Sequence, residues 1–441
     1  MIASSLFLCP CKNRLVAPGK ELWITMHSDR SPLSELLGRT SLERFFRVYW
    51  ERRPLLIRKS SGDGFKNLLS MRAMDEILSS GFLRHPECRI VKDGKVIPLD
   101  RYVVGDPLKG VIDVESLYAE YQNEATITLT SLQRYCRPLT DFCRSMEAQF
   151  SQPFQANVYL TRRGSQGFAP HFDTHDVFVL QVAGRKEWRL YDHPASLPGD
   201  SLPFQEAMSD KARVRRAVTL GPGDLLYIPR GHIHDANAAE EDSLHITVGV
   251  LSATWGDALV EAVNSLIRSD AEFRASLPVG FAAKWRMPAD LRGKVARMQA
   301  KAAGNLRLGD AVLNLAERFI SERRHNHSGR LMELAQTDRL TLSSLVGRRA
   351  GAVYSLKREG GKMSVVLYRK KVRFPLFVAP ALAYACGKTL FRPSELPGGL
   401  SGSSKLLLVR CLIREGLLYA APGRARRAGV RAAPAGAKAA G

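Results

Sequence analysis

The 441-residue chain predicts an α+β fold in which a small β-barrel is followed by helices and then by a second, mixed module. Three observations indicate this. Residues 151–250 hold short β-rich runs separated by Gly and Pro turns, which is typical of a sandwich or closed barrel. Residues 252–330 carry apolar side chains at helical spacing. Residues 331–420 combine helical pieces with two strands, which is the pattern of a winged helix.

The composition is that of a globular protein, with 45% hydrophobic and 24% charged residues. The length predicts two or three domains. No run of eighteen apolar residues exists, which excludes a membrane-spanning helix of ordinary length. The expected divisions are a disordered leader at 1–30, with Met1 or Met26 as the start, a barrel domain at 31–251, a helical region at 252–330, a winged-helix-like domain at 331–420 and a disordered basic tail at 421–441.

The net charge of +22 is unevenly distributed. Residues 341–441 hold 19 Lys and Arg against 3 Asp and Glu, and five of these basic residues fall in the Ala- and Gly-rich tail. A basic end of this kind favours anionic partners such as RNA. The seven cysteines are scattered without paired spacing. They therefore argue against a disulfide framework and for a reducing compartment, the cytoplasm.

The first half of the barrel domain predicts mixed helix and strand. A helix is expected to begin at Thr40 or Ser41 and to end at Pro54, because apolar residues recur on one helical face between them. A short hairpin is expected around Asp93-Gly94. The strands expected after it are 156–161, 171–182, 187–191, 214–220, 224–228 and 243–250.

Two apolar stripes in the helical region have two interpretations. They either pack in a core or form a dimer interface, since helices that follow a barrel have little else to pack against. The stripes are Leu259, Ala262, Val263, Leu266 and Ile267, and Val312, Leu315, Ala316 and Phe319. In the last module we expect helices near 331–335, 342–346, 379–386 and 403–414, and strands at 352–356 and 363–367.

The motif His171-Phe172-Asp173 carries the chemistry that the sequence predicts. In a strand, residues i and i+2 face the same side, so an imidazole and a carboxylate are presented together. A second imidazole would complete the two-histidine, one-carboxylate triad that binds Fe(II) and leaves positions open. The segment 221–237 offers His232 and His234. His175 is a third competitor, and His245 and Thr247 on the last strand could also point inward, so spacing alone leaves the third ligand open.

Two stretches resemble the JmjC-type cupin core of the ribosomal oxygenases, a family of Fe(II)- and 2-oxoglutarate-dependent protein hydroxylases. Asn157–Tyr191 contains the H-F-D and G-R-K-E-W motifs, and Gly221–Val250 contains P-R-G-H-I-H. The resemblance implies a double-stranded β-helix as the catalytic domain over 31–251. It also implies a helical dimerisation region over 252–330, hence a homodimer, and a winged helix over 331–420.

The resemblance also implies roles for single residues. His171, Asp173 and His234 would be the metal ligands, while His232 falls on a variable position. Lys186 would pair with the distal carboxylate of 2-oxoglutarate, which needs a fixed cation. Asn157 and Thr247 would supply further polar contacts to this co-substrate. No catalytic residue beyond the metal ligands is assigned.

The function implied is hydroxylation of an arginine or histidine side chain of a ribosomal protein. One alternative is the same chemistry on a small molecule or on methylated lysine, and the rim of the pocket would decide between these substrates. Another is a non-enzymatic cupin joined to a winged helix that binds nucleic acid. The intact H-x-D…H set argues against this last alternative.

Overall fold

The structure, a computed structural model, divides the chain into two compact units. One unit runs over residues 26–323, and the other combines residues 1–25 with residues 324–441. In the described part of the chain, no helix is long and apolar enough to cross a membrane. The described residues are 14–17, 20–24, 32–59, 64–106, 109–192, 196–199, 202, 204–205, 208, 212–238, 240–283, 289–324, 329–349 and 351–421.

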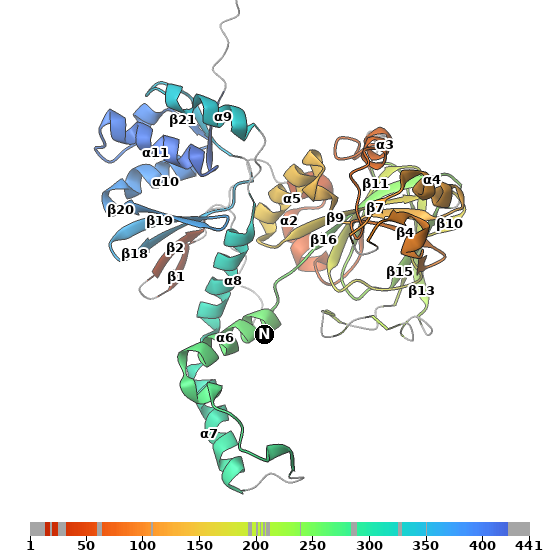
Figure 1. Ribbon diagram of the computed structural model, residues 1–441, viewed down its shortest axis with the longest axis horizontal. Coiled ribbons are helices and arrows are strands. Elements are labelled where there is room, and N and C mark those ends of the chain that lie inside the picture. Colours follow the sequence, from red (N-terminus) through yellow and green to blue (C-terminus); the bar gives the residue numbers. More distant parts are fainter. Residues whose placement is uncertain are drawn as a thin grey trace, which may run out of the picture. The chain divides into compact units, whose positions relative to one another are not determined.

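Two antiparallel sheets form the centre of the first unit (Figure 1). Their strand orders are β3-β14-β11-β16-β9-β8-β4-β5 and β10-β15-β12-β13. Apolar side chains from both sheets, among them Val179, Trp188 and Leu226, pack into one core between them. The strands are β3 Leu55–Ile57, β4 Cys88–Lys92, β5 Lys95–Val96, β8 Thr126–Leu129, β9 Phe154–Thr161, β10 Ser165–Gln166, β11 Asp176–Ala183, β12 Lys186–Tyr191, β13 Val214–Leu220, β14 Leu225–Ile228, β15 His234–Ala238 and β16 Ser243–Val250, with β6 Val103–Val104 and β7 Val111–Ile112 paired separately.

Five of the six predicted barrel strands are found within two residues of their expected ends. The sixth prediction, 171–182, is wrong at its start, because β11 begins only at Asp176. Residues 171–175 form a bend whose pairing is limited to an isolated bridge between His171 and His234. The predicted hairpin at Asp93-Gly94 is confirmed as the connection of β4 and β5. Both turn residues have positive φ, as a two-residue hairpin of this kind requires.

Helices cover the outer face of the large sheet (Figure 1). The predicted helix start at Ser41 is confirmed, since the Ser41 side chain caps the helix by accepting from the Arg44 amide at 3.2 Å. Its predicted end at Pro54 is wrong, because the helical turns end at Tyr49 and Glu51 already has a positive φ. The helix widens into a π-helical turn whose Phe45 packs against Phe178 and Tyr227. The helices are α1 Pro32–Leu37, α2 Leu42–Arg44, α3 Met71–Ser79, α4 Val114–Gln122 and α5 Arg137–Phe150, with short turns η1 Phe45–Tyr49, η2 Leu99–Arg101 and η3 Leu132–Arg134.

Three longer helices follow the barrel: α6 Trp255–Ser269, α7 Ala289–Asn305 and α8 Leu308–Glu322, with turns η5 Ala271–Arg274 and η6 Phe281–Ala283. Helix α6 packs against α8. The predicted stripe on α6 divides between two environments. Ala262 and Leu266 are buried, whereas Leu259 and Val263 are 48% and 39% exposed. Part of the stripe is therefore core, and part remains open for a partner.

The second unit contains a five-stranded sheet of order β1-β2-β18-β19-β20 and a three-stranded sheet of order β21-β17-β22. Helices α10 and α11 share one apolar core with the strands β17 to β22. The elements are β1 Arg14–Ala17, β2 Lys20–Ile24, α9 Arg330–Gln336, η7 Thr337–Arg339, β17 Val346–Arg348, β18 Ser355–Glu359, β19 Lys362–Leu367, β20 Lys370–Pro375, η8 Leu376–Val378, α10 Ala379–Gly387, β21 Leu390–Phe391, η9 Pro393–Glu395, α11 Gly402–Arg414 and β22 Leu418–Ala420.

Two predictions for this unit are wrong. The leader at 1–30 contains β1 and β2, and β2 pairs with β18 from Ile24↔Ser355 to Leu22↔Lys357. The segment 342–346 is a turn that leads into β17, not a helix. The predicted pair of strands also belongs to a larger sheet, in which β20 and β2 flank β19 and β18. The other leader residues and the tail from 422 onward lie outside the described residues.

Candidate active site

Three side chains converge at distances suited to a metal ion. His171, Asp173 and His234 each offer one ligand atom, and these atoms lie within 4.8 Å of one another. The His234 Nε2 atom is 3.7 Å from Asp173 Oδ2. Within the described ranges, no other group of three His, Cys, Asp or Glu side chains meets this condition. The set is that of the facial triad, in which two imidazoles and one carboxylate leave further positions open.

The backbone brings the ligands together across a bridge between two segments. The His171 amide donates to the His234 carbonyl at 3.1 Å, and the His234 amide donates to the His171 carbonyl at 2.8 Å. The centroids of the two imidazole rings consequently lie 4.7 Å apart. The Gly231 amide donates to the Asp173 carbonyl at 3.1 Å and holds the middle of the bend. The triad therefore depends on this bridge and not on the strand alternation that the sequence predicted.

Backbone carbonyls orient both imidazoles. The Nδ1 atom of His171 lies 2.8 Å from the Ala169 carbonyl, and that of His234 lies 3.0 Å from the His232 carbonyl. A carbonyl can only accept, so each Nδ1 carries the proton and each Nε2 keeps its lone pair. Such outer contacts fix the tautomer that binds metal. Both histidines thus present Nε2 as the ligand atom.

The protonation states suit metal binding as well. Burial, and then the neighbouring His171 ring, lower the pKa of His234, which keeps this imidazole neutral. Burial raises the pKa of Asp173, but the surrounding imidazoles outweigh it and the net shift is downward. A neutral imidazole and an ionised carboxylate are the forms that coordinate metal.

A cavity of about 270 Å³ contains the triad and extends along β12. Lys186 and Trp188 line it from alternate positions of this strand, as the period of two requires. Leu190 of the same strand is the register partner of His234. Lys186 lies four residues before Leu190 on this strand. At a rise of ~3.3 Å per residue, its backbone is therefore roughly 13 Å along the strand from the residue opposite His234. The cation and the triad occupy different ends of one cavity.

Lys186 is a buried cation whose partner is a hydroxyl group. Its side chain is 3% exposed, and Nζ donates to Thr161 Oγ1 at 2.8 Å. Burial alone lowers the pKa of Lys186 to about 7. Among the described residues, no carboxylate forms an ion pair with it. An ammonium buried in this way fits an incoming carboxylate, which would restore its charge.

Two other predicted contacts differ in their placement. Thr247 lines the cavity. Asn157 does not; its Oδ1 accepts from the Ser131 amide and from Gln155, both at 3.0 Å, and its side chain hydrogen-bonds the Tyr159 phenol. Its contact with a co-substrate stays a prediction.

The competing histidines also separate. His245 lines the cavity, while His232 is buried on the turn before His234 and is not part of the group at ligand distance. His175 occupies the space above Gly249, where an added Cβ would meet its ring at 2.5 Å. The bare backbone of Gly249 therefore makes room for His175, which the sequence did not reveal.

Three aromatic lining residues were not predicted: Tyr159, Phe168 and Trp188. The Tyr159 ring stacks on His245 at 4.8 Å, and Trp188 meets His245 edge to face at 5.4 Å. Trp188 was within reach of sequence reasoning, since it stands at i+2 from Lys186 on one strand. Tyr159 stands likewise at i+2 from Asn157. Phe168 lies outside the strands, where periodicity carries no signal.

The JmjC domain family matches residues 129–258. Among curated proteins, the chain is 35% identical over 257 residues to "Ribosomal oxygenase 1" of Gallus gallus, covering 55% of this chain and 41% of that protein. It is 32% identical over 257 residues to "Bifunctional lysine-specific demethylase and histidyl-hydroxylase NO66" of Dictyostelium discoideum, covering 56% and 49%. The chain thus spans about half the length of these curated relatives or less.

A solved structure also shares the fold. It is that of YcfD, a ribosomal oxygenase from Escherichia coli, in complex with cobalt and 2-oxoglutarate. The match covers 86% of this chain and 98% of YcfD, with a TM-score of 0.53 and 19% sequence identity. At this identity the likeness shows the fold alone.

Proposed function

We propose that this chain is an Fe(II)- and 2-oxoglutarate-dependent oxygenase, because the JmjC domain family matches residues 129–258 and the similar curated proteins are named ribosomal oxygenases and histidyl-hydroxylases. Its substrate would be a side chain of a ribosomal protein, an arginine or a histidine. One observation carries the proposal. The same cavity is lined by three side chains of metal-ligand type and by a buried lysine, Lys186, that forms no ion pair with a carboxylate of the described residues.

The residues present fit both groups. His171, Asp173 and His234 would hold the metal, and Lys186 would hold the distal carboxylate of 2-oxoglutarate. When bound, the metal and this co-substrate supply oxygen activation, in which 2-oxoglutarate becomes succinate and CO₂ while a substrate C–H bond gains oxygen. The chain's own part is to orient ligands and exclude water. Apolar side chains such as Val177, Val179 and Trp188 line the cavity and keep it dry.

No side chain is needed as a general base, since a C–H hydrogen is removed by oxidation and not by proton transfer. Lys186 instead moves from a partly protonated to a fully charged state as the carboxylate enters. The Thr161 hydroxyl accepts from Nζ and holds the ammonium in place for that encounter. Thr247 and Tyr159 add polar groups to the cavity wall.

The choice of a ribosomal protein follows the names of the relatives. One relative is also named as a lysine-specific demethylase, which keeps methylated lysine as the second candidate substrate. The two candidates predict different products. Hydroxylation adds a stable oxygen atom, whereas oxidation of an N-methyl group releases formaldehyde.

The test is 2-oxoglutarate turnover with ribosomal proteins, measured as succinate. His171→Ala and His234→Ala should abolish turnover, and Lys186→Ala should raise the KM for 2-oxoglutarate. His232→Ala is the matched control, because His232 is adjacent to the triad but outside it. Full turnover in His234→Ala combined with none in His232→Ala would show the ligand assignment to be wrong. Wild-type protein that never forms succinate would remove the basis of the proposal.

Mass spectrometry of ribosomal proteins from cells with and without the gene would identify the substrate. We expect a gain of one oxygen atom on an arginine or histidine that depends on the gene. Formaldehyde release from methylated peptides without that gain would favour the second candidate.

We further propose that the chain forms a homodimer through α6 and α8. Trp255, Leu259, Val260 and Val263 on α6 are 74%, 48%, 60% and 39% exposed, and Val312 on α8 is 38% exposed. Apolar side chains at this density on adjacent helices favour a protein partner over solvent. A second copy would bury them.

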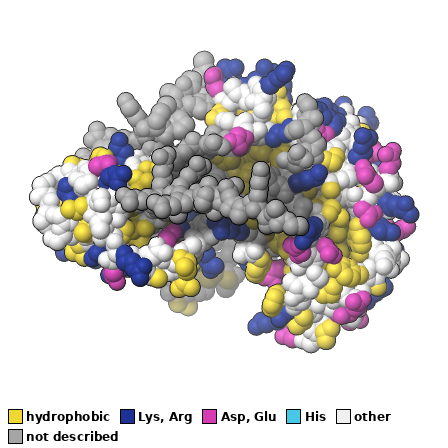
Figure 2. Space-filling view, turned by 90° about the horizontal axis from the view of Figure 1, so that it is seen from above, with side chains coloured by type: hydrophobic (Ala, Val, Ile, Leu, Met, Phe, Trp, Pro, Cys, Tyr) yellow, Lys and Arg dark blue, Asp and Glu magenta, His cyan; other side chains and the backbone are white. Residues whose placement is uncertain are grey.

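The second unit is proposed to act as a winged-helix module that contacts ribosomal RNA. Its strands β18 to β20 expose basic side chains, and the acidic Glu359 among them is already paired with Lys357 and Lys371. The exposed basic residues are Arg358, Lys362, Arg369, Lys370, Lys371 and Arg373. In Figure 2, basic side chains (dark blue) lie among apolar and acidic ones on the described surface. Binding through phosphates would weaken with added salt. We place this activity in the cytoplasm, where the five described cysteines would remain free thiols.

A further inference from the structure

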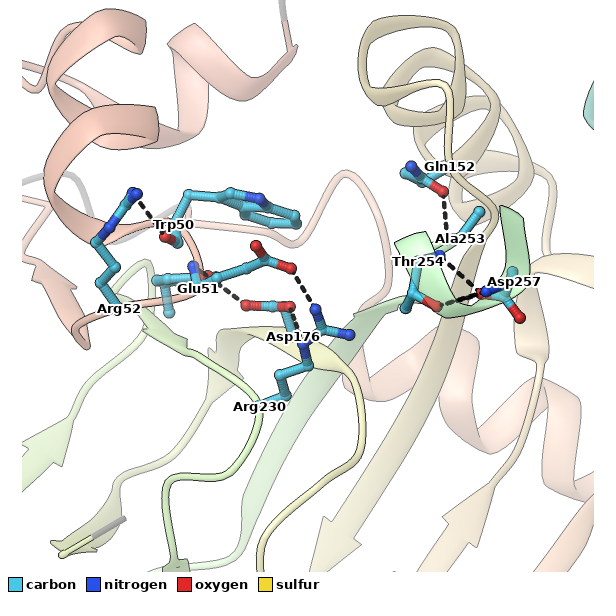
Figure 3. A network of polar contacts seen from close by, with 10 residues as sticks. Trp50, Glu51, Arg52, Gln152, Asp176, Arg230, Ala253, Thr254 and Asp257 are labelled. Carbon is cyan, nitrogen blue, oxygen red and sulfur yellow. Dashed lines mark hydrogen bonds and ion pairs between the residues drawn. The ribbon is translucent and has the colours of Figure 1, made fainter. Parts of the chain in front are cut away.

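A buried cluster of charged and hydrogen-bonded side chains lies outside the cavity but joins the segments that carry the ligands (Figure 3). Asp176 is fully buried and accepts from the Tyr227 hydroxyl. Arg230 lies between two carboxylates: its guanidinium pairs with Glu51 and has Nε 3.9 Å from Asp176 Oδ2. The Glu51 amide donates to the Tyr227 oxygen at 2.9 Å and closes the ring of contacts.

The cluster continues the ladder that forms the triad. Asp176 follows the ligand Asp173 by three residues, and Arg230 precedes the ligand His234 by four. The side chains of Asp176 and Arg230 meet between the two segments, where Arg230 Nε lies 3.9 Å from Asp176 Oδ2. Between this contact and the bridge at His171, the Gly231 amide bonds the Asp173 carbonyl. Three successive contacts thus join the two ligand-bearing segments, and the Asp176–Arg230 contact is the one farthest from the metal site.

The N-terminal part of the unit supplies the outer end of the cluster. Glu51 has a φ of +55°, a left-handed conformation that is unfavourable for a residue with a side chain. It is held there by Tyr227 and Arg230, and the preceding Trp50 ring stacks on Tyr227 at 6.0 Å. Buried charges and a strained backbone both lower the free energy of unfolding, so apolar side chains at these positions would give a more stable core. Their presence beside a ligand-bearing bend points to a task of orientation.

We propose that Asp176, Arg230 and Glu51 are positioning residues that keep Asp173 and His234 at the separation a metal ion requires. Glu51, which comes from the N-terminal helical turn and does not line the cavity, is then part of the metal-binding apparatus. This inference rests on the proposed metal site. Groups that orient ligands from the second layer commonly change metal affinity by roughly ten- to a hundredfold when altered.

The test is titration of the full-length, metal-free protein with Co(II), followed by quenching of tryptophan fluorescence, because the Trp188 ring lies 5.9 Å from that of His234. Glu51→Gln and Asp176→Asn should each raise the Kd for Co(II) by roughly ten- to a hundredfold. Glu51 is 29% exposed at its side chain, so Glu51→Gln remains testable even if Asp176→Asn does not fold. Thermal unfolding of each metal-free variant provides the comparison with folding stability.

Glu43→Gln is the matched control. It removes the exposed ion pair between Glu43 and Arg47, whose nitrogen and oxygen atoms lie 3.6 Å apart. Both residues are on the same N-terminal segment as Glu51 but outside the cluster. Its Kd for Co(II) should equal that of the wild type. A Glu51→Gln protein that binds Co(II) as tightly as the wild type, whatever its melting temperature, overturns the inference and leaves the proposed function intact. A wild type that binds Co(II) no better than His171→Ala overturns both.

Discussion

The buried ammonium of Lys186 makes 2-oxoglutarate binding depend on pH in a way that can be calculated. With a pKa of about 7, Lys186 is roughly half protonated at pH 7 in the free protein, and the bound carboxylate requires the charged form. Each further pH unit then costs about 1.4 kcal/mol, or tenfold in affinity. Between pH 7 and pH 8.5 the affinity for 2-oxoglutarate should therefore fall about fifteenfold.

Calorimetric titration of the Co(II)-loaded protein with 2-oxoglutarate, repeated from pH 6.5 to 8.5, measures this directly. Lys186→Arg keeps the charge at every pH, because a guanidinium does not titrate in this range, so its affinity should change little above pH 7. Lys186→Met removes the charge and should weaken binding at pH 7 by about 3 kcal/mol or more, upwards of a hundredfold. Equal pH slopes in the wild type and Lys186→Arg would refute the reasoning.

The same shift has a consequence for folding. The pKa of Lys186 is lower in the folded protein than in the unfolded chain, so the unfolded chain binds more protons between about pH 7 and pH 10.5. The free energy of unfolding of the ligand-free protein should therefore rise with pH through this window. Lys186→Met should lack that contribution to the rise, and it should not be less stable than the wild type at pH 7.

Three further predictions concern packing and assembly. Gly249→Ala places a Cβ 2.5 Å from the His175 ring, so it should lower the free energy of unfolding by about 1–3 kcal/mol in urea denaturation, and a change below 0.5 kcal/mol would contradict the close contact. Leu259→Asp should turn the proposed dimer into a monomer by light scattering, whereas an unchanged mass would exclude this face of α6 as the interface. Glu147→Gln leaves the buried ends of Arg144 and Arg323 without their carboxylate and should lower stability by about 3–5 kcal/mol, with a loss under 1 kcal/mol arguing against the buried pairs.

The strands of the barrel were predictable because their signals are local. Alternating side chains and Gly or Pro turns define β12, β13, β14 and β16 to within a residue of their ends. The exception is the ligand-bearing segment 171–175, which has the composition of a strand but bends toward the cavity. Its course is determined by hydrogen bonds to residues 231 and 234, some sixty positions later, and no local pattern reports such contacts.

The candidate site divides along the same line. His171, Asp173, His234 and Lys186 are polar residues within recognisable motifs, so the sequence and its family resemblance could nominate them as candidates, and the structure places all four on one cavity. The space that Gly249 leaves for His175 depends on two chain segments meeting in three dimensions. The cluster of Asp176, Arg230 and Glu51 likewise joins residues that are up to 179 positions apart. Neither feature has a periodicity to detect.

The pairing of β2 with β18 has a consequence for how the chain is made. Lys20–Ile24 are synthesised about 330 residues before their partner Ser355–Glu359. At about 5–20 residues per second, this delay is on the order of 20–60 s. The first strands must therefore wait while the barrel unit has time to fold. A chain started at Met26 would lack β1 and β2. This change should destabilise the second unit more than the barrel unit, because β2 pairs with β18 of the second unit.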